Sequence, residues 1–179
     1  MRTTLLLAAC LLISAFASAQ NVNIRKQRIL AAEAACGDPH VNFSVVRGEY
    51  VTKVASPSSG MARVYVVEPT WWGYPQLGSP LYGPTMRVGL DGRWVGAMGG
   101  NSYMTFTVSA GEHHLCFRRQ SKLKRVANIL YLAKLTATAG ATYYFSCPSG
   151  SMLLPYLDPD AARLLLAKAV PSVSTIKKQ

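Results

Sequence analysis

Short segments in which apolar and polar residues alternate make up most of the chain after Val41, and turn residues separate them. Successive side chains of a strand point to opposite faces of a sheet, so a period of two is typical of strands that bury one face. The segment Ser102–Val108 shows the period most clearly, because Met104, Phe106 and Val108 would share one face. The pattern therefore favours a β-rich domain.

An Asp91-Gly92 pair separates two such segments, Thr85–Leu90 and Arg93–Ala97. Asp-Gly between apolar runs is the strongest short-range hairpin signal, because both central positions of the tight turn need a positive φ. The sequence therefore predicts a hairpin centred on these two residues.

Regular turn signals predict about seven or eight short strands in all. Besides the three segments above, they are Val41–Val45, Ala62–Val67, His113–Phe117, Ile129–Leu135 and Thr142–Cys147. We expect a mainly β fold, an antiparallel β-sandwich or an open barrel, with a short helix near each end.

The expected N-terminal helix covers residues 24–35, a run of strong helix formers that Gly37 ends. Near the other end, Asp158 is a capping carboxylate before Pro159, and residues 161–169 follow as a helix that Pro171 stops. We expect the tail after Pro171 to be loose. The predicted organisation is a signal peptide (1–19), a helix and linker (20–40), the β-sandwich domain (41–157) and a helix with its tail (158–179).

Residues 1–19 contain the three parts of a secretory signal in order: Arg2, an apolar run and small residues that end at Ala19. The run is far shorter than the ~20 apolar residues of a membrane-spanning helix, and no later stretch reaches that length. The residues before Cys10 resemble a lipoprotein cleavage box, but the apolar run in front of it is too short. We therefore expect cleavage after Ala19 and an exported protein, periplasmic or secreted.

Cys36, Cys116 and Cys147 would remain after cleavage. Exported proteins meet oxidising conditions, so we expect one disulfide and one leftover thiol. The spacing does not fix which pair forms, and Cys36 with Cys116 is the simplest choice.

A metal site is the alternative use of Cys116. His114 and Cys116 are two residues apart and would face the same way on a strand, with His113 beside them and His40 as a further ligand. Zinc or copper suits such nitrogen and sulfur ligands. A cysteine in a disulfide cannot be a thiolate ligand, so the two hypotheses exclude each other, and an oxidising compartment favours the disulfide.

The formal net charge of the chain is +11 at pH 7, which favours acidic partners. One stretch holds five of the cations: Arg118, Arg119, Lys122, Lys124 and Arg125. They would either meet an anionic envelope surface, a glycan or another envelope protein, or form a solvated loop between two strands. No aromatic residue is interleaved with them, which argues against a nucleic-acid partner.

An aromatic cluster, Trp71, Trp72 and Tyr74, lies in a connection that is rich in glycine and proline. Exposed rings there would stack on sugar rings or hold a proline-rich peptide. Alternatively, the connection folds back and buries its own tryptophans.

No catalytic constellation stands out in the sequence. A Gly-x-Ser-x-Gly elbow and a glycine-rich phosphate loop are both missing. The turn explains Asp91, and the helix cap explains Asp158. We expect no cofactor and no enzyme activity, and a hydrolase whose residues meet only in the fold is the third hypothesis.

Five stretches resemble a bacterial family known only as domain of unknown function 2846. They are Ala62–Val67, Val88–Gly96, Asn101–Tyr103, Ala110–Cys116 and Ala139–Phe145, within about residues 60–148. The Asp-Gly hairpin and the later Gly-x-His turn also look like PEGA domains, which are small β-sandwich modules. The resemblance implies an exported, often envelope-associated β-sandwich and no assigned activity. The leading expectation is therefore a non-enzymatic module that binds or supports something in the cell envelope.

Overall fold

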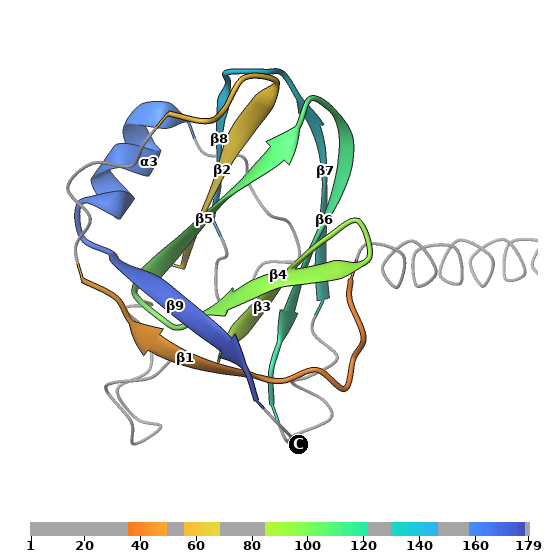
Figure 1. Ribbon diagram of the computed structural model, residues 1–179. Coiled ribbons are helices and arrows are strands. Elements are labelled where there is room, and N and C mark those ends of the chain that lie inside the picture. Colours follow the sequence, from red (N-terminus) through yellow and green to blue (C-terminus); the bar gives the residue numbers. More distant parts are fainter. Residues whose placement is uncertain (1–35, 50–55, 69–84, 122–129, 147–157, 178–179) are drawn as a thin grey trace, which may run out of the picture.

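The computed structural model describes residues 36–49, 56–68, 85–121, 130–146 and 158–177. They form two β-sheets and one short helix, which confirms the prediction of a mainly β fold (Figure 1). The predicted signal peptide (1–19) and the predicted helix over 24–35 lie outside the described residues.

One sheet has five strands and mixes strand directions. Its order is β1 (Phe43–Arg47), β9 (Val170–Ile176), β5 (Ser102–Ser109), β2 (Met61–Glu68) and β8 (Thr142–Ser146). β2 pairs with β8 in parallel, and so does β5 with β9. The prediction of a wholly antiparallel fold is therefore wrong for this sheet, because alternation along a strand fixes its buried face but not its neighbour or their relative direction.

The other sheet has four antiparallel strands. Its order is β4 (Arg93–Met98), β3 (Met86–Leu90), β6 (Gly111–Arg119) and β7 (Leu130–Ala137). Both sheets contribute to one hydrophobic core. The members of this core with no exposed surface are Ala62, Val64, Val66, Val88, Met98, Leu115 and Phe117.

The predicted hairpin between β3 and β4 is confirmed. Its two central residues, Asp91 and Gly92, have φ values of 48° and 83°. Positive φ at both positions matches the twist of the two strands, which is why the Asp-Gly pair is favoured there.

A β-bulge lies further along the same hairpin. Val88 pairs with Gly96 and the next residue, Gly89, pairs with Trp94, so Val95 has no residue opposite it. β4 is an edge strand, and a bulge there re-aims the side chain of the extra residue. Val95 is 37% exposed as a result.

The C-terminal tail, predicted to be loose after Pro171, is strand β9. Pro171 suggests the end of the helix and a loose tail, but proline is tolerated near the start of a strand. Pro171 is the second residue of β9. Serine side chains then join β9 to the edge of β4. The backbone N–H of Ala97 donates to Ser174 Oγ at 3.0 Å, and that of Gly99 donates to Ser172 Oγ at 3.4 Å. Side-chain bonds of this kind leave no signature in hydrophobic alternation.

The predicted C-terminal helix is α3 (Pro159–Leu166). The Asp158 carboxylate accepts hydrogen bonds from the backbone N–H groups of Asp160 (3.1 Å) and Ala161 (3.3 Å), as the capping prediction requires. The helix ends before the predicted residue 169, and the chain enters β9 at Val170.

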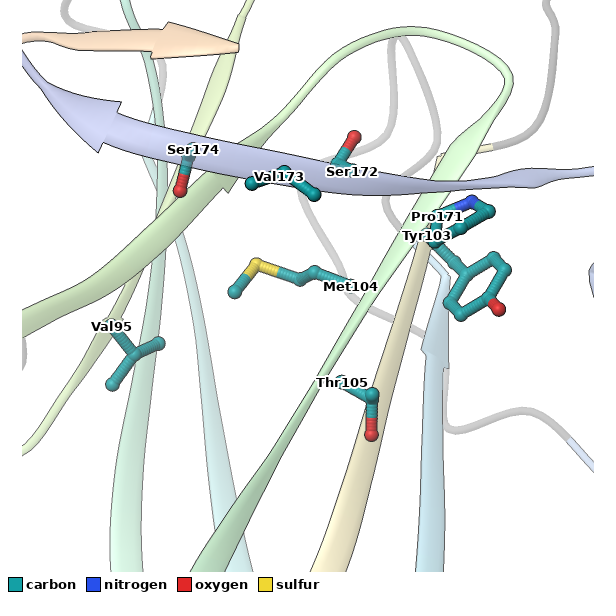
Figure 2. Close-up of a pocket in the computed structure, with 8 residues that line it drawn as sticks. All are labelled: Val95, Tyr103, Met104, Thr105, Pro171, Ser172, Val173 and Ser174. Atoms are coloured by element: carbon teal, nitrogen blue, oxygen red, sulfur yellow. The ribbon is translucent and has the colours of Figure 1, made fainter. Parts of the chain in front are cut away.

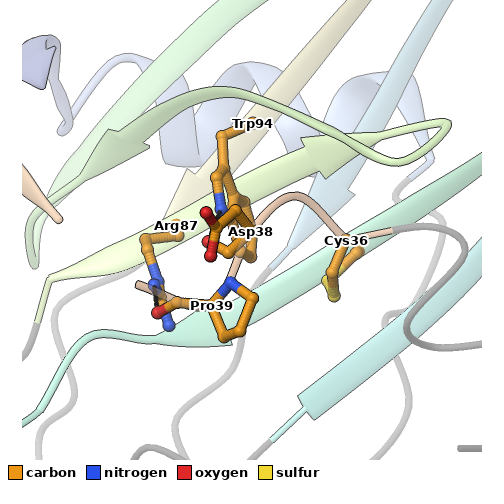
Figure 3. Close-up of a disulfide and its surroundings, with 6 residues drawn as sticks. Cys36, Asp38, Pro39, Arg87 and Trp94 are labelled. Carbon is orange, nitrogen blue, oxygen red and sulfur yellow. Dashed lines mark hydrogen bonds between the residues drawn. A yellow bond between two sulfur atoms is a disulfide. The ribbon is translucent and has the colours of Figure 1, made fainter. Parts of the chain in front are cut away.

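Cys36 and Cys116 form a disulfide, so the pairing favoured from the sequence is present (Figure 3). The two residues are 80 positions apart, and their Cα atoms are separated by 5.1 Å. Neighbouring side chains of a strand alternate, so Cys116 points away from the core residues Leu115 and Phe117. The disulfide therefore fixes the chain at Cys36 to the outer face of the four-stranded sheet.

Arg87 of β3 extends this attachment (Figure 3). Its Nη1 donates to the carbonyl groups of Pro39 (2.9 Å) and Val41 (2.7 Å), and its guanidinium carbon lies 4.7 Å from the centre of the Trp94 ring. Trp94 Nε1 donates to the carbonyl of Asp38 at 2.7 Å. Arg87 is only 3% exposed, and these carbonyls and the ring compensate part of its loss of water; its Nε has no hydrogen-bond partner among the described residues.

Two further contacts complete the attachment of residues 36–43. The side-chain amide of Gln120 forms two hydrogen bonds with the backbone of Phe43, as a neighbouring strand would. Phe43 N donates to Gln120 Oε1 at 2.7 Å, and Gln120 Nε2 donates to Phe43 O at 2.9 Å. Gly37 lies so close to Trp94 that a Cβ would come within 2.5 Å of the ring. Glycine is therefore needed at this position.

Replacing both Cys36 and Cys116 with serine should lower the free energy of unfolding by about 4 kcal/mol, because the disulfide closes a long loop in the unfolded chain. Urea unfolding of the oxidised protein measures the difference. Cys147→Ser removes a cysteine outside this disulfide and should leave the midpoint unchanged. A double variant as stable as the wild type would contradict the expectation.

Candidate functional site

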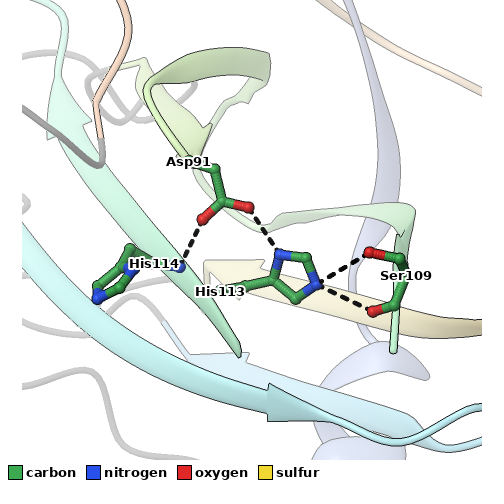
Figure 4. Close-up of polar contacts among 4 residues, drawn as sticks. All are labelled: Asp91, Ser109, His113 and His114. Atoms are coloured by element: carbon green, nitrogen blue, oxygen red, sulfur yellow. Dashed lines mark hydrogen bonds and ion pairs between the residues drawn. The ribbon is translucent and has the colours of Figure 1, made fainter. Parts of the chain in front are cut away.

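Asp91, His113 and Ser109 form a polar cluster where the β3–β4 turn meets β6 and the end of β5 (Figure 4). His113 Nδ1 lies 2.6 Å from Asp91 Oδ2, and His113 Nε2 lies 2.9 Å from the Ser109 carbonyl oxygen. The other Asp91 oxygen accepts a hydrogen bond from the backbone N–H of His114 at 2.7 Å. The carboxylate therefore ties the hairpin turn to β6.

Both ring nitrogens of His113 face acceptors, so the ring satisfies both only when it carries two protons. Burial opposes this protonation, but the hydrogen bonds to Asp91 and to the Ser109 carbonyl outweigh it and raise the pKa of His113. Burial also acts to raise the pKa of Asp91, but the hydrogen bonds from His113 and His114 lower it below its ordinary value. The two side chains therefore form an ion pair at pH values below the raised pKa of His113.

The cluster contains the three residue types of a Ser-His-Asp triad, but its histidine is not in the protonation state that a triad needs. A triad needs an unprotonated Nε2 that accepts the serine proton. Here Nε2 donates to the Ser109 carbonyl, and Ser109 Oγ lies 3.5 Å away. The contacts therefore describe a structural ion pair and do not support the hydrolase hypothesis.

Sequence reasoning missed this cluster because the turn alone explained Asp91. One available signal was the place of His113 in the alternation of β6, where it shares the buried face with Leu115 and Phe117. A polar residue at an inward position requires a partner. Glu68 occupies a similar position at the end of β2, beyond Val64 and Val66.

Glu68 is a buried carboxyl, 4% exposed. Burial raises its pKa to about 7, and the charge of Arg119 lowers the pKa only in part. Its Oε2 has no hydrogen-bond partner among the residues that the structure describes. Glu68 is therefore divided between its neutral and charged forms near neutral pH.

The alternative metal site loses its sulfur ligand, because Cys116 is in the disulfide. Both ring nitrogens of His113 have protein partners, and His114 is exposed on the opposite side of β6. His40 is exposed as well. Within the described ranges, no three His, Cys, Asp or Glu side chains gather as a metal-binding group. These contacts speak against the site predicted at His113, His114 and Cys116.

The basic run divides between strand β6 and the segment that follows it. Arg118 and Arg119 are the last residues of β6 and are half-buried, so they do not belong to a solvated loop. Arg118 lies opposite Arg87 in the β3–β6 ladder. The remaining members of the run lie outside the described residues: Lys122, Lys124 and Arg125.

A groove of about 380 Å³ opens between β9, β5 and the edge strand β4 (Figure 2). Within the described part of the chain, the residues that line it are uncharged, chiefly Val95, Tyr103, Met104, Thr105, Val173 and Ser174. Figure 2 shows the Met104 side chain lying across the groove toward Val95.

The aromatic cluster of Trp71, Trp72 and Tyr74 lies outside the described residues, so its role stays a prediction. Of the helices that the structure describes, none has the length and apolar content needed to cross a membrane.

Asp91→Asn should lower the pKa of the His113 imidazole, because the variant removes the neighbouring negative charge. Asparagine tolerates the positive φ of the turn, so the hairpin should be kept. NMR titration of the histidine ring signals measures this pKa. Asp160→Asn removes an exposed carboxylate of α3 and should leave the pKa unchanged. A His113 pKa that is equal in wild type and Asp91→Asn would contradict the ion pair.

The ion pair also gives stability a defined pH dependence. The pKa of His113 is raised above 6.5, so its contribution is complete below pH 6.5 and is lost as the pH rises through the raised pKa. The pKa of Asp91 is lowered below 3.8, so its contribution is lost only as the pH falls through the lowered pKa. Urea unfolding of wild type and Asp91→Asn should therefore differ most between pH 3.8 and 6.5. We expect roughly 1 kcal/mol, because the half-exposed carboxylate is screened by water.

Comparisons of the chain with protein-family models, with curated proteins and with solved structures found no match.

Proposed function

We propose that this chain is an exported, non-catalytic binding module of the bacterial cell envelope, built as a β-sandwich. The observation that carries the proposal is the disulfide between Cys36 and Cys116. Such bonds persist in oxidising compartments and are rare in the cytosol. Together with the secretory features of residues 1–19, the disulfide supports export to the periplasm or beyond.

The way the sheets meet supports a sandwich over an open barrel. Both sheets contribute side chains to one core, including Phe117 from one and Phe145 from the other, with ring centres 6.5 Å apart. Serine hydroxyls of β9, and not a backbone ladder, join it to the edge of β4. The resemblance to domain of unknown function 2846 and to PEGA domains favours the same architecture and an envelope location.

An anionic envelope surface is the proposed partner of the whole chain. The formal net charge is +11, and in two short stretches, Arg25–Arg28 and Lys122–Arg125, three of the four residues are cations. Basic groups attract anionic headgroups over a Debye length, ~8 Å at physiological salt.

Expression with the chain's own N-terminus in a bacterial host should give a product that begins at Gln20, because small residues precede that junction. Under denaturing conditions, a maleimide should label one thiol before reduction and three after it, since Cys147 is the leftover cysteine. Mass spectrometry measures both results. The control Cys147→Ser should show no label before reduction. An unprocessed product with four labelled thiols before reduction, Cys10 included, would contradict export.

The purified mature protein should sediment with vesicles that contain phosphatidylglycerol and not with vesicles of phosphatidylcholine alone. Replacing Lys122, Lys124 and Arg125 with glutamate should weaken binding roughly a hundredfold, at about 1 kcal/mol for each basic residue. Sedimentation at several salt concentrations measures the affinity.

The matched control replaces Arg47, Arg93 and Lys177 with glutamate, which changes the net charge equally at other places on the surface. We expect this control to weaken binding much less. An equal loss in both triple variants would assign the attraction to net charge and not to the basic run. Equal binding to neutral vesicles would exclude an anionic partner.

A further inference from the structure

The groove between β9, β5 and β4 is bordered by an edge of β5 that, in the described part of the chain, has no partner strand over most of its length. β5 pairs with β2 along one edge over its whole length. Along its other edge, β9 pairs with it only at Ser102 and Tyr103. Beyond Tyr103, no strand of the described residues is bonded to that edge.

The backbone groups of Thr105 and Thr107 point to this open side. The backbone N–H of Arg63 in β2 donates to the carbonyl of Ala141, just before β8. The backbone groups of its neighbours in β2, Ala62 and Val64, therefore point the other way, toward β5, and so do those of Val66. Their partners there include Met104 and Phe106. The two threonines lie between these bonded residues, so their N–H and C=O groups face away from β2. Both threonines are exposed.

Other contacts close the two ends of this open stretch. β9 occupies the edge at Tyr103. At the far end, the outward carbonyl of Ser109 accepts a hydrogen bond from His113 at 2.9 Å. Among the described residues, the part of this edge that no strand pairs with is thus Thr105–Thr107, a span of about 7 Å at ~3.3 Å per residue.

Exposed apolar side chains border the same opening. Val95, on the bulge of β4, is 37% exposed, and Val173 of β9 is 51% exposed. Met104 lies between them at 8% exposure (Figure 2). An apolar recess beside unpaired backbone donors and acceptors has the two parts of a strand-addition site, since backbone bonds give affinity and pockets accept alternate side chains.

We propose that this groove binds an extended, uncharged segment of another protein, which adds to β5 as a short strand at Thr105–Thr107. The segment's backbone exchanges hydrogen bonds with the two threonines, and its alternate apolar side chains rest on Val95, Met104 and Val173. The inference rests on the proposed binding role and deepens it, because it names a surface and the chemistry of its partner.

Other occupants fit the groove less well. A lipid headgroup or an acidic glycan would find no cation among the described residues that line it. A second copy of the chain would have to bring a whole sheet edge into the recess between β4 and β9. A single extended backbone is narrow enough to enter and carries donors and acceptors at the strand repeat.

Amide hydrogen exchange of the full mature chain, followed by NMR, is the first measurement. The N–H groups of Thr105 and Thr107 should exchange rapidly, whereas those of Met104 and Phe106 should be protected. Protection of both threonines that persists on dilution would mean that the chain covers its own edge. Protection that is lost on dilution would mean that a second copy covers it. Either result would overturn the proposal.

The binding probe is a displayed library of random nonapeptides, panned against the full chain at physiological salt. We expect enriched sequences to be uncharged in their centre with alternating apolar residues. A synthetic peptide of enriched sequence should slow the exchange of the Thr105 and Thr107 amides at least tenfold. Failure to enrich any peptide, or protection only at other amides, would overturn the proposal.

Thr105→Pro removes one outward N–H and should weaken peptide binding at least tenfold, whereas the matched control Thr105→Val keeps the backbone and should retain binding. If the proline variant does not fold, the enriched peptide with N-methyl groups on its bonding edge replaces it and should not bind the wild type. Full binding by the proline variant or by the N-methylated peptide would overturn the proposal. Acidic peptides that bind wild type and Thr105→Pro with equal affinity would also overturn it. No membrane is present, so failure here is distinct from failure of the vesicle experiment.

Discussion

A guanidinium group on the outer face of a four-stranded sheet can be withdrawn from water only if other groups replace its hydration. Arg87 is almost fully buried there, and residues 36–42 supply the carbonyls that replace water. The same residues are held by the disulfide at Cys36 and by the indole of Trp94. The burial of Arg87, the disulfide and the Trp94 contact therefore depend on one another, because all three need residues 36–42 in place. β1 follows directly and adds to β9, so the edge of the five-stranded sheet is built on this attachment.

Features with local chemistry could be predicted from the sequence. The Asp91-Gly92 turn needs only the φ preferences of two residues, and the cap at Asp158 needs only one carboxylate beside free N–H groups. The alternating segments likewise indicate strands without knowledge of their neighbours. β9 was missed because Pro171 suggests an end and because serine hydroxyls join the strand to β4. The parallel pairs depend on contacts between distant segments, which alternation does not encode.

The candidate sites divide in the same way. The cysteine pairing could be favoured because the compartment limits cysteine chemistry, and the structure then leaves no thiolate at Cys116. The Asp91–His113 pair could not be found from spacing, since it joins a turn to a strand that follows another strand. The open edge at Thr105–Thr107 was also invisible, because it depends on how far β9 follows β5 before the two strands diverge.

The position of the disulfide determines how a mechanical load would enter the fold. A pull on the chain before Cys36 is carried through sulfur to Cys116, which lies within β6 between two hydrogen-bonded neighbours, β3 and β7. Such a force enters a strand that is paired on both sides before it reaches β1, the edge strand of the other sheet. For a module held at a surface by its N-terminal side, the covalent link would bypass the weakest strand and place the tension on one of the best supported.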